Sequence, residues 1–313
     1  MRYVLRKLTS TLLTIILVAL ITFLVFQILP GDPALVMLGP DADPAQVAQL
    51  HQSMGLDGNT ALRFFKWLKA AAKGDFGTSY RYGLPISSLI WNAFSVSLSI
   101  GLLGLGLSVL IGIPLGVLLA SRKSHGKGMV LTFLSQMGLS VPAFLVGILL
   151  ISLLAVRIPL FPSMGYVRFS QSHSRWFASI FLPSLSLAIG CASVLSQYLS
   201  SSILEQQKKD YVRTVRSEGA GESRILYLHV LRNSLVPVVT IFGMLVADVL
   251  GGSIIIENVF SLPGIGKLLT SSITSRDLPL LQALVLYLSF IVIVCNFAVD
   301  VVYRLIDPRI RLE

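Results

Sequence analysis

The chain has 313 residues, of which 54% are hydrophobic and only 13% are charged, and its mean hydropathy is +0.79. Soluble domains carry roughly twice that share of charge, so the composition excludes an ordinary soluble globular protein. A net charge of +10 in a soluble chain would favour nucleic acid as a partner, but here the basic residues border apolar segments. Orientation in a lipid membrane explains them better, and no nucleic-acid partner is expected.

The first apolar segment, residues 8–29, follows Arg2, Arg6 and Lys7. A signal peptide also starts with basic residues, but its apolar region is only about 7–15 residues long. This segment is long enough to cross ~30 Å of hydrocarbon, and no small-residue cleavage site follows it. Residues 1–29 are therefore predicted to hold a cytoplasmic N-terminus and an uncleaved first transmembrane helix.

Residues 30–88 are polar and predict a small helical subdomain outside the membrane. Two short helices are expected, from 43 or 44 to 54 and from 60 to 73, with turns at 55–58 and 74–79. The segment is too small to fold as an independent enzyme.

Five further apolar segments predict transmembrane helices, at residues 93–120, 129–156, 177–203, 233–256 and 280–302. The fold class is thus an all-α polytopic membrane protein with six spans, five of them in a core at residues 89–303, before a cytoplasmic tail at 304–313. Small residues recur every four positions in the second span, which lets a neighbouring helix approach closely. They are Ser108, Gly112, Gly116 and Ala120. The excess of basic residues falls on the side that keeps both termini in the cytoplasm.

Residues 205–237 form the one long, highly charged segment in the C-terminal two-thirds of the chain. The spacing of its apolar residues predicts two short amphipathic helices, with a bend at Gly219–Gly221 and Ser223 as the N-cap of the second helix. A solvated connecting loop is the simplest interpretation. A docking surface is the alternative, because apolar side chains on both helices need a groove on a partner. The candidate docking residues, all within 205–232, are Tyr211, Arg213, Arg216, Glu218, Gly219, Arg224 and His229.

In this segment, YVRTVRSEG and HVLRN resemble the cytoplasmic coupling loop of B-type permeases of ABC importers, in the dipeptide, oligopeptide and nickel class. Gly219 matches the glycine of the general Glu-Ala-Ala signature of such loops, while Arg213, Thr214 and Val215 replace the Glu-Ala-Ala itself. LPGDPA, MGLD, GDFGTS, IIIENVFSLPGIG and DPRIR match the same class in the same order. The resemblance therefore covers essentially the whole chain.

The resemblance implies the type I ABC importer permease fold, in a bacterial inner membrane, and half of a translocation pathway for peptides, nickel or metal chelates. It also implies the partners: a second homologous permease, two ATPase subunits docked on the coupling loops, and an external solute-binding protein. ATP and Mg would bind to the ATPases, with no cofactor on this chain. Consistently, neither Gly126–Gly128 nor Gly264–Lys267 completes a GxxxxGK[ST] loop, so the chain is not expected to be an enzyme.

From the residues alone, a self-sufficient secondary transporter and a membrane-embedded enzyme are the alternatives. Secondary transporters often have repeated halves and several intramembrane charges, but no repeat is visible, and only Asp248 and Asp300 are acidic within spans. An intramembrane enzyme needs clustered catalytic or metal-binding side chains, whereas the four histidines are scattered in loops and no metal site is expected. Cys191 and Cys295 lie in apolar runs and are expected to be small core residues.

Asp248 is the candidate residue of the substrate pathway, together with Ser253. It lies roughly 22 Å along the fifth span from Asn233, at ~1.5 Å per residue. One interpretation is structural: the carboxylate reaches outward to the membrane surface, or it bonds a serine or a backbone group of a neighbouring helix. The other is that it lines the pathway and offers a negative charge to a passing amine or metal cation.

Overall fold

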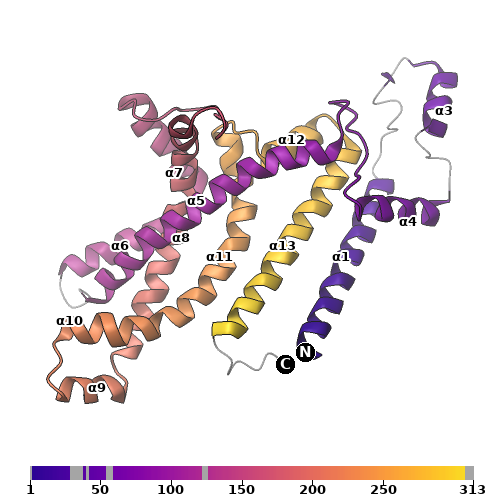
Figure 1. The fold of residues 1–313 in the computed structure, drawn as a ribbon. Coiled ribbons are helices and arrows are strands. Elements are labelled where there is room, and N and C mark those ends of the chain that lie inside the picture. Colours follow the sequence, from indigo (N-terminus) through magenta and orange to yellow (C-terminus); the bar gives the residue numbers. More distant parts are fainter. Residues whose placement is uncertain (1, 29–37, 40–41, 54–58, 122–125, 307–313) are drawn as a thin grey trace. The chain divides into compact units, whose positions relative to one another are not determined.

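The computed structural model describes residues 2–28, 38–39, 42–53, 59–121 and 126–306, and nearly all of this part is helical (Figure 1). Within it no strand forms, and the only extended pairing is an isolated bridge between Thr78 and Pro85. The chain divides into two compact units, one of residues 1–95 with 264–297 and one of residues 96–263 with 298–313. The all-helical fold expected from the composition is confirmed.

The first unit is held together by aromatic packing between its N-terminal helices. Phe23 of α1 and Phe64 of α4 meet edge to face, with ring centroids 5.4 Å apart, and Trp67 lies 5.8 Å from Phe23. Asn59 caps α4 by accepting a hydrogen bond from the backbone N–H of Ala61 at 2.9 Å. The helices of this unit are α1 (Arg2–Ile28), α3 (Pro44–Ser53), α4 (Thr60–Ala71), the start of α5 (Ile86–Ser121), α12 (Ile265–Thr274) and most of α13 (Leu278–Ile306).

The two short helices predicted after the first span are confirmed as α3 and α4. The turn predicted at 74–79 is also present, with Gly74 and Gly77 at φ of +80° and +81°. The turn predicted at 55–58 lies outside the described residues.

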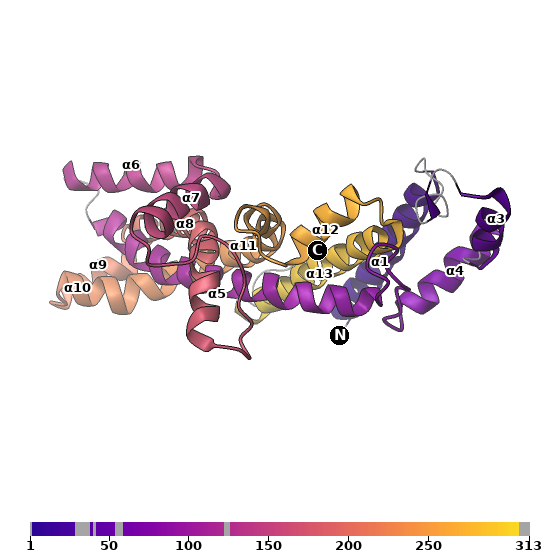
Figure 2. The same cartoon turned by 90° about the horizontal axis from the view of Figure 1, so that it is seen from above.

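The second unit is built around α8, which contacts α6, α7 and α11 (Figure 2). Its apolar residues form one continuous core that includes Ile180, Leu199 and Phe260. Besides the rest of α5, its elements are α6 (Gly126–Ser140), α7 (Ala143–Leu150), the π-helical segment η1 (Ile151–Arg157), α8 (His173–Gln206), α9 (Asp210–Ser217), α10 (Glu222–Arg224), the π-helical segment η2 (Ile225–Val230) and α11 (Leu231–Val259).

The stripe of small residues on α5 does bring a neighbouring helix close. A Cβ added to Gly116 would lie 2.9 Å from both the Cβ of Leu199 and the carbonyl oxygen of Ser196. One added to Gly112 would lie 3.0 Å from the carbonyl oxygen of Ala192. The neighbour is α8, and the close approach predicted from the four-residue spacing is confirmed.

By length and composition, five helices of the described chain can cross a membrane, or six when one bent pair is counted as a single span. That pair is Met129–Ser140 and Ala143–Arg157, with a bend of 105° between them, in place of the single third span predicted at residues 129–156. The break falls at Pro142, whose ring disfavours the helical conformation of the residue before it. Pro142 then becomes the N-cap of α7.

The charged segment differs from its prediction in two respects. Its second short helix does not end, because α10, η2 and α11 follow one another without interruption from Glu222 to Val259. No glycine or proline lies between Glu222 and Pro237 to stop it. The prediction that Ser223 is the N-cap is wrong, since the N-cap is Gly221 and Ser223 lies inside the first turn.

Candidate functional site

The turn after α9 has the geometry of a Schellman motif, a common way of ending a helix. Gly219 has φ of +86°, its N–H donates to the carbonyl of Arg216 at 3.1 Å, and the N–H of Ala220 donates to the carbonyl of Val215 at 3.4 Å. A residue with a side chain is strained at such a φ. The sequence therefore placed the bend correctly, and Gly219 is the residue that makes it.

The apolar face of α9 packs on the chain itself. Val212 is fully buried, and Ile225 and Val230 of η2 join it in the core of the second unit. Tyr211 and Val215 are half-buried against the same core. On η2, Tyr227 and Leu228 remain 58% and 60% exposed. For α9, the inference that the apolar side chains need a groove on a partner is wrong, because the chain itself provides the groove. A partner that meets α9 therefore meets its polar face.

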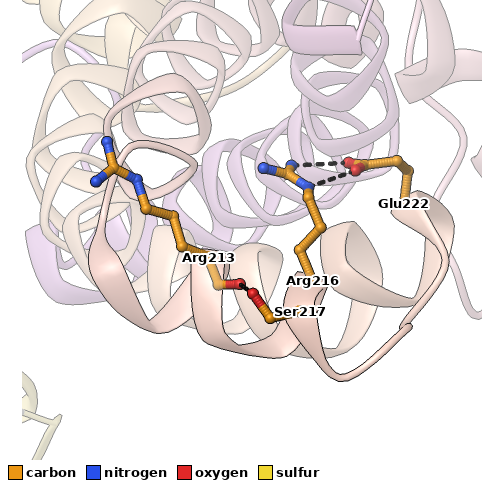
Figure 3. Close-up of polar contacts among 4 residues, drawn as sticks. All are labelled: Arg213, Arg216, Ser217 and Glu222. Atoms are coloured by element: carbon orange, nitrogen blue, oxygen red, sulfur yellow. Dashed lines mark hydrogen bonds and ion pairs between the residues drawn. The ribbon is translucent and has the colours of Figure 1, made fainter.

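That polar face is held in a defined arrangement by one ion pair. Arg216 donates from Nε to Oε1 of Glu222 at 2.7 Å and from Nη2 to Oε2 at 3.1 Å, so that the guanidinium and the carboxylate pair in two places across the turn (Figure 3). Arg213 points away from this pair (Figure 3). Its Nη1 lies 3.6 Å from Oδ1 of Asp210 on the same helix. The hydroxyl of Ser217 donates to the carbonyl oxygen of Arg213 at 3.0 Å.

The pair also shifts the titration of both its members. The hydrogen bonds to Glu222, and then the charge of that carboxylate, raise the pKa of the Arg216 guanidinium. The hydrogen bonds from Arg216 lower the pKa of Glu222. Both shifts favour the charged forms.

The other candidate docking residues divide between the two faces. Glu218 and Arg224 are exposed, as Arg213 and Arg216 are. Tyr211 is half-buried and donates from its hydroxyl to Oε1 of Gln206 at 3.0 Å, which ties α9 back to the end of α8. His229 is half-buried in η2. The structure thus gathers the charged candidates on the exposed side and turns Tyr211 inward.

The two candidates for the substrate pathway lie on different faces of α11. Asp248 is exposed on α11. Gly251 follows on the same face, with open space where a Cβ would be. Ser253 is five residues beyond Asp248, about 140° around the helix, and it is buried.

A carboxylate that the sequence reasoning missed is Glu257, which is fully buried at the end of α11. It accepts a hydrogen bond from Ser97 Oγ of α5 at 2.6 Å. The signal was present, because Ser253 and Glu257 are four residues apart and the three residues next to Glu257 on its N-terminal side, 254–256, are isoleucines. No comparable pattern in the sequence points to Ser97 of α5 as the partner of Glu257.

Comparison with known proteins decides the family. Residues 112–312 match the family described as "Binding-protein-dependent transport system inner membrane component", and residues 1–100 match the corresponding N-terminal family. The chain belongs to this permease family. It is an inner-membrane permease of the ABC importer class, and its several apolar helices are those of a multi-pass membrane protein.

Relatives of the permease match it from end to end. A protein of Brucella suis biovar 1, whose name assigns it to a peptide transport system as a permease, is 36% identical over 310 residues, or 99% of each chain. The glutathione transport system permease protein GsiC of Salmonella choleraesuis is 37% identical over 313 residues, which is the whole of both chains. These matches favour the ABC importer permease over the self-sufficient secondary transporter.

The solved structures agree with the fold. A chain from the MetNI methionine ABC transporter, in a study of its inward-facing conformations, superposes with a TM-score of 0.58 at 17% identity. The superposition covers 70% of the permease and 96% of the MetNI chain. A chain from an amino acid ABC transporter gives a TM-score of 0.51 at 15% identity. The helical permease fold of ABC importers, predicted from the resemblance, is confirmed.

Proposed function

We propose that the permease forms half of a translocation pathway for peptides, and that a second homologous permease subunit forms the other half. The substrate class rests on the relatives, which are named for peptide and glutathione transport and align over 99% or more of this chain. Nickel and metal chelates, which the sequence resemblance also allows, have no counterpart among these relatives. An external solute-binding protein delivers the peptide.

Two ATPase subunits drive the transport, and α9 with its turn is the place where an ATPase docks. The observation that carries this assignment is the continuity of the chain beyond the turn, where α10, η2 and α11 form one helix that enters the membrane. A displacement of α9 is therefore passed directly to a transmembrane helix. ATP and Mg bind to the ATPases, and the permease itself has no catalytic role and no cofactor. Coupling requires that the contact at α9 differ between the two states of the transporter.

Both termini and α9 lie on the cytoplasmic side, and the subdomain at residues 30–88 lies outside. Gly221 and Ser170 are both exposed and fall on opposite sides in this arrangement. In a cysteine-free background, Gly221→Cys should react only with membrane-permeant thiol reagents, and Ser170→Cys should also react with impermeant reagents in whole cells. Labelling of Gly221→Cys by an impermeant reagent contradicts the orientation.

The docking assignment is tested by photo-crosslinking in membranes that contain the complete transporter. Thr214 is exposed on the polar face of α9, and Phe169 is 53% exposed in the segment between η1 and α8. A photoreactive amino acid at Thr214 should crosslink to an ATPase subunit, whereas the same residue at Phe169 should not. If Thr214 gives no ATPase adduct under conditions where the subunits copurify, α9 is not the docking site.

The role of the turn is tested by two substitutions of Gly219. A Cβ at this position meets no atom within 4 Å, so only the positive φ resists a side chain. Asn tolerates that conformation and Val does not. In proteoliposomes with all subunits, Gly219→Val should lose most ATP-driven peptide uptake while remaining inserted, and Gly219→Asn should keep most of it. Uptake by the permease alone, driven by an ion gradient, would instead support a secondary transporter.

A further inference from the structure

An arginine on a docking helix can contact the partner protein, or it can hold the docking helix in place. Arg213 and Arg216 of α9 differ in their surroundings, so the two roles can be assigned separately. Arg216 points toward Glu222, across the turn, whereas Arg213 points away from that pair (Figure 3). The two arginines are three residues apart on the same exposed face of α9. They are therefore natural controls for each other.

On the buried side of the turn, Val212 of α9 packs in one core with Ile225 and Val230 of η2, so what remains to be explained is how the exposed side of the turn is held. Its backbone hydrogen bonds, from Gly219 to Arg216 and from Ala220 to Val215, close the end of α9. The next element begins at Gly221, which has no side chain to cap it. On the exposed side of the turn, the side chains of Arg216 and Glu222 link α9 to the start of the long helix by two hydrogen bonds.

The geometry of the pair suits control of orientation better than stabilisation of the fold. The side chains of Arg216 and Glu222 are 50% and 70% exposed, and ion pairs of this kind add little to folding stability. Two parallel hydrogen bonds between a planar guanidinium and a carboxylate do fix a mutual orientation, which a lysine ammonium cannot do in the same way.

We propose that Arg216 and Glu222 are positioning residues, which hold α9 at a fixed angle to the helix of α10, η2 and α11 so that movement of α9 is transmitted to the membrane. Neither side chain is then the contact with the ATPase. This inference rests on the proposed docking at α9. It differs from that function in a checkable way, because an internal pair tolerates reversal of its charges and a contact with a partner does not.

The pair persists over the pH range of a transport assay. Since the pKa of Glu222 is lowered from its ordinary value of 4.5, its contribution is present above that value and is lost as the pH falls through the lower folded value. Since the pKa of Arg216 is raised, its contribution is lost only at strongly alkaline pH. The pair must therefore be broken by substitution.

The test compares four variants in the reconstituted transporter, with peptide uptake per ATP hydrolysed as the readout. Arg216→Glu and Glu222→Arg should each lower this ratio by about fivefold or more, the factor that corresponds to ~1 kcal/mol. The double variant Arg216→Glu with Glu222→Arg restores the pair in reverse and should return the ratio to within about twofold of the wild type. Arg216→Lys, which keeps the charge without the double hydrogen bond, should fall between the two. Assembly with the ATPases and the melting temperature should not change, because the pair is exposed.

Failure to recover in the double variant overturns the proposal and makes Arg216 a direct contact with the ATPase. A normal ratio in both single variants also overturns it. Arg213→Glu with Asp210→Arg is the matched comparison, since that pair lies within α9 on the face proposed for docking and does not cross the turn. Its reversal should reduce copurification with the ATPases, which reversal of Arg216 with Glu222 should not do. The Thr214 crosslink separates the two levels of inference. An adduct without rescue leaves the docking intact and removes the positioning role, and no adduct removes the docking itself.

Discussion

Ser97 on α5 donates a hydrogen bond from Oγ to Oε1 of Glu257 on α11 at 2.6 Å, with both side chains buried. The two residues are 160 positions apart in the sequence. Buried polar groups of this kind are costly when one partner is removed, because the other keeps its desolvation cost without its hydrogen bond. The bond therefore ties α5 to α11 at the end of α11 that is farther from α9.

Glu257→Leu should destabilise the permease by about 1–3 kcal/mol, since it leaves the hydroxyl of Ser97 without this acceptor. Glu257→Gln keeps an acceptor oxygen in the same place and should cost clearly less. The measurement is thermal unfolding of the purified permease in detergent. Equal melting temperatures for the Leu variant and the wild type would remove Glu257 from the packing of α5 on α11.

A second buried carboxylate joins two turns of the other unit. Asp277 is the N-cap of α13, where the N–H of Leu280 donates to its Oδ1 at 3.3 Å, and it also accepts from Ser79 Oγ at 2.5 Å. The N–H of Arg81 adds a further bond at 3.2 Å. One side chain thus holds the turn before α5 against the turn before α13.

Asp277→Ala should loosen both turns, because it removes the cap of α13 and the acceptor of the other turn at once, at a cost of about 1–3 kcal/mol. Hydrogen exchange should accelerate at residues 79–84 and at the start of α13. Asp75→Ala is the matched control, as Asp75 is exposed and accepts one hydrogen bond, from Gly77 at 3.0 Å. If both variants exchange alike, Asp277 does not join the turns.

The same carboxylate acts on the neighbouring tyrosine. Burial, and then the negative charge of Asp277, raise the pKa of Tyr80 from 10.0 to about 12. Because the folded value is the higher one, the contribution of Tyr80 to stability is fully present below pH 10 and is lost as the pH rises toward about 12. The melting temperature should fall over this interval, and it should fall less in Tyr80→Phe.

The effect of the Asp277 charge is tested separately with Asp277→Asn, in which Tyr80 should ionise at lower pH when its ionisation is followed by ultraviolet absorbance. Superimposable titrations of wild type and Asp277→Asn would show that the charge of Asp277 does not reach Tyr80.

The features that the sequence predicted well depend on residues close together in the chain. The apolar spans, the small residues facing α8 and the bend at Gly219 are each set by composition or spacing within one element. The inward direction of the apolar face of α9 was not predictable in this way, because it depends on a groove that distant residues build. The partners of Glu257 and Asp277 lie 160 and 198 positions away, where no local pattern points.

The length of the helix beyond α9 was also not predictable from composition. Charged residues at Arg224 and Arg232 favour a short helix that ends before the fifth span, but nothing in the backbone chemistry of this stretch ends a helix. The break in the third span was missed for the opposite reason. Pro142 disfavours a continuous helix there, but the residues on both sides are apolar, and composition alone predicts one uninterrupted span. Composition finds what can be buried in a membrane, and glycine and proline decide where the helices end.

Asp248 is where the proposed pathway can be tested most directly. It is exposed on α11, and a carboxylate facing lipid near the middle of a membrane costs ~2.5–3.5 kcal/mol. The carboxylate of Asp248 is therefore better placed facing water, solute or the second permease than facing lipid. Met244 lies one turn earlier on the same face and is 57% exposed, so it provides the matched control.

Asp248→Asn should leave the transporter assembled, with its basal ATP hydrolysis intact, and should lower uptake of peptides that carry a free ammonium group. Asp248→Leu should lower it further, because it removes the polar group as well as the charge, while Met244→Leu should transport normally. Uptake of an N-acetylated peptide should be affected much less by Asp248→Asn, since that peptide has no N-terminal charge for the carboxylate to attract. The measurement is initial uptake into proteoliposomes at saturating binding protein, with each peptide's binding to that protein determined separately. Equal uptake by the Asn and Leu variants, for both peptides, would assign Asp248 to packing between subunits and remove it from the pathway.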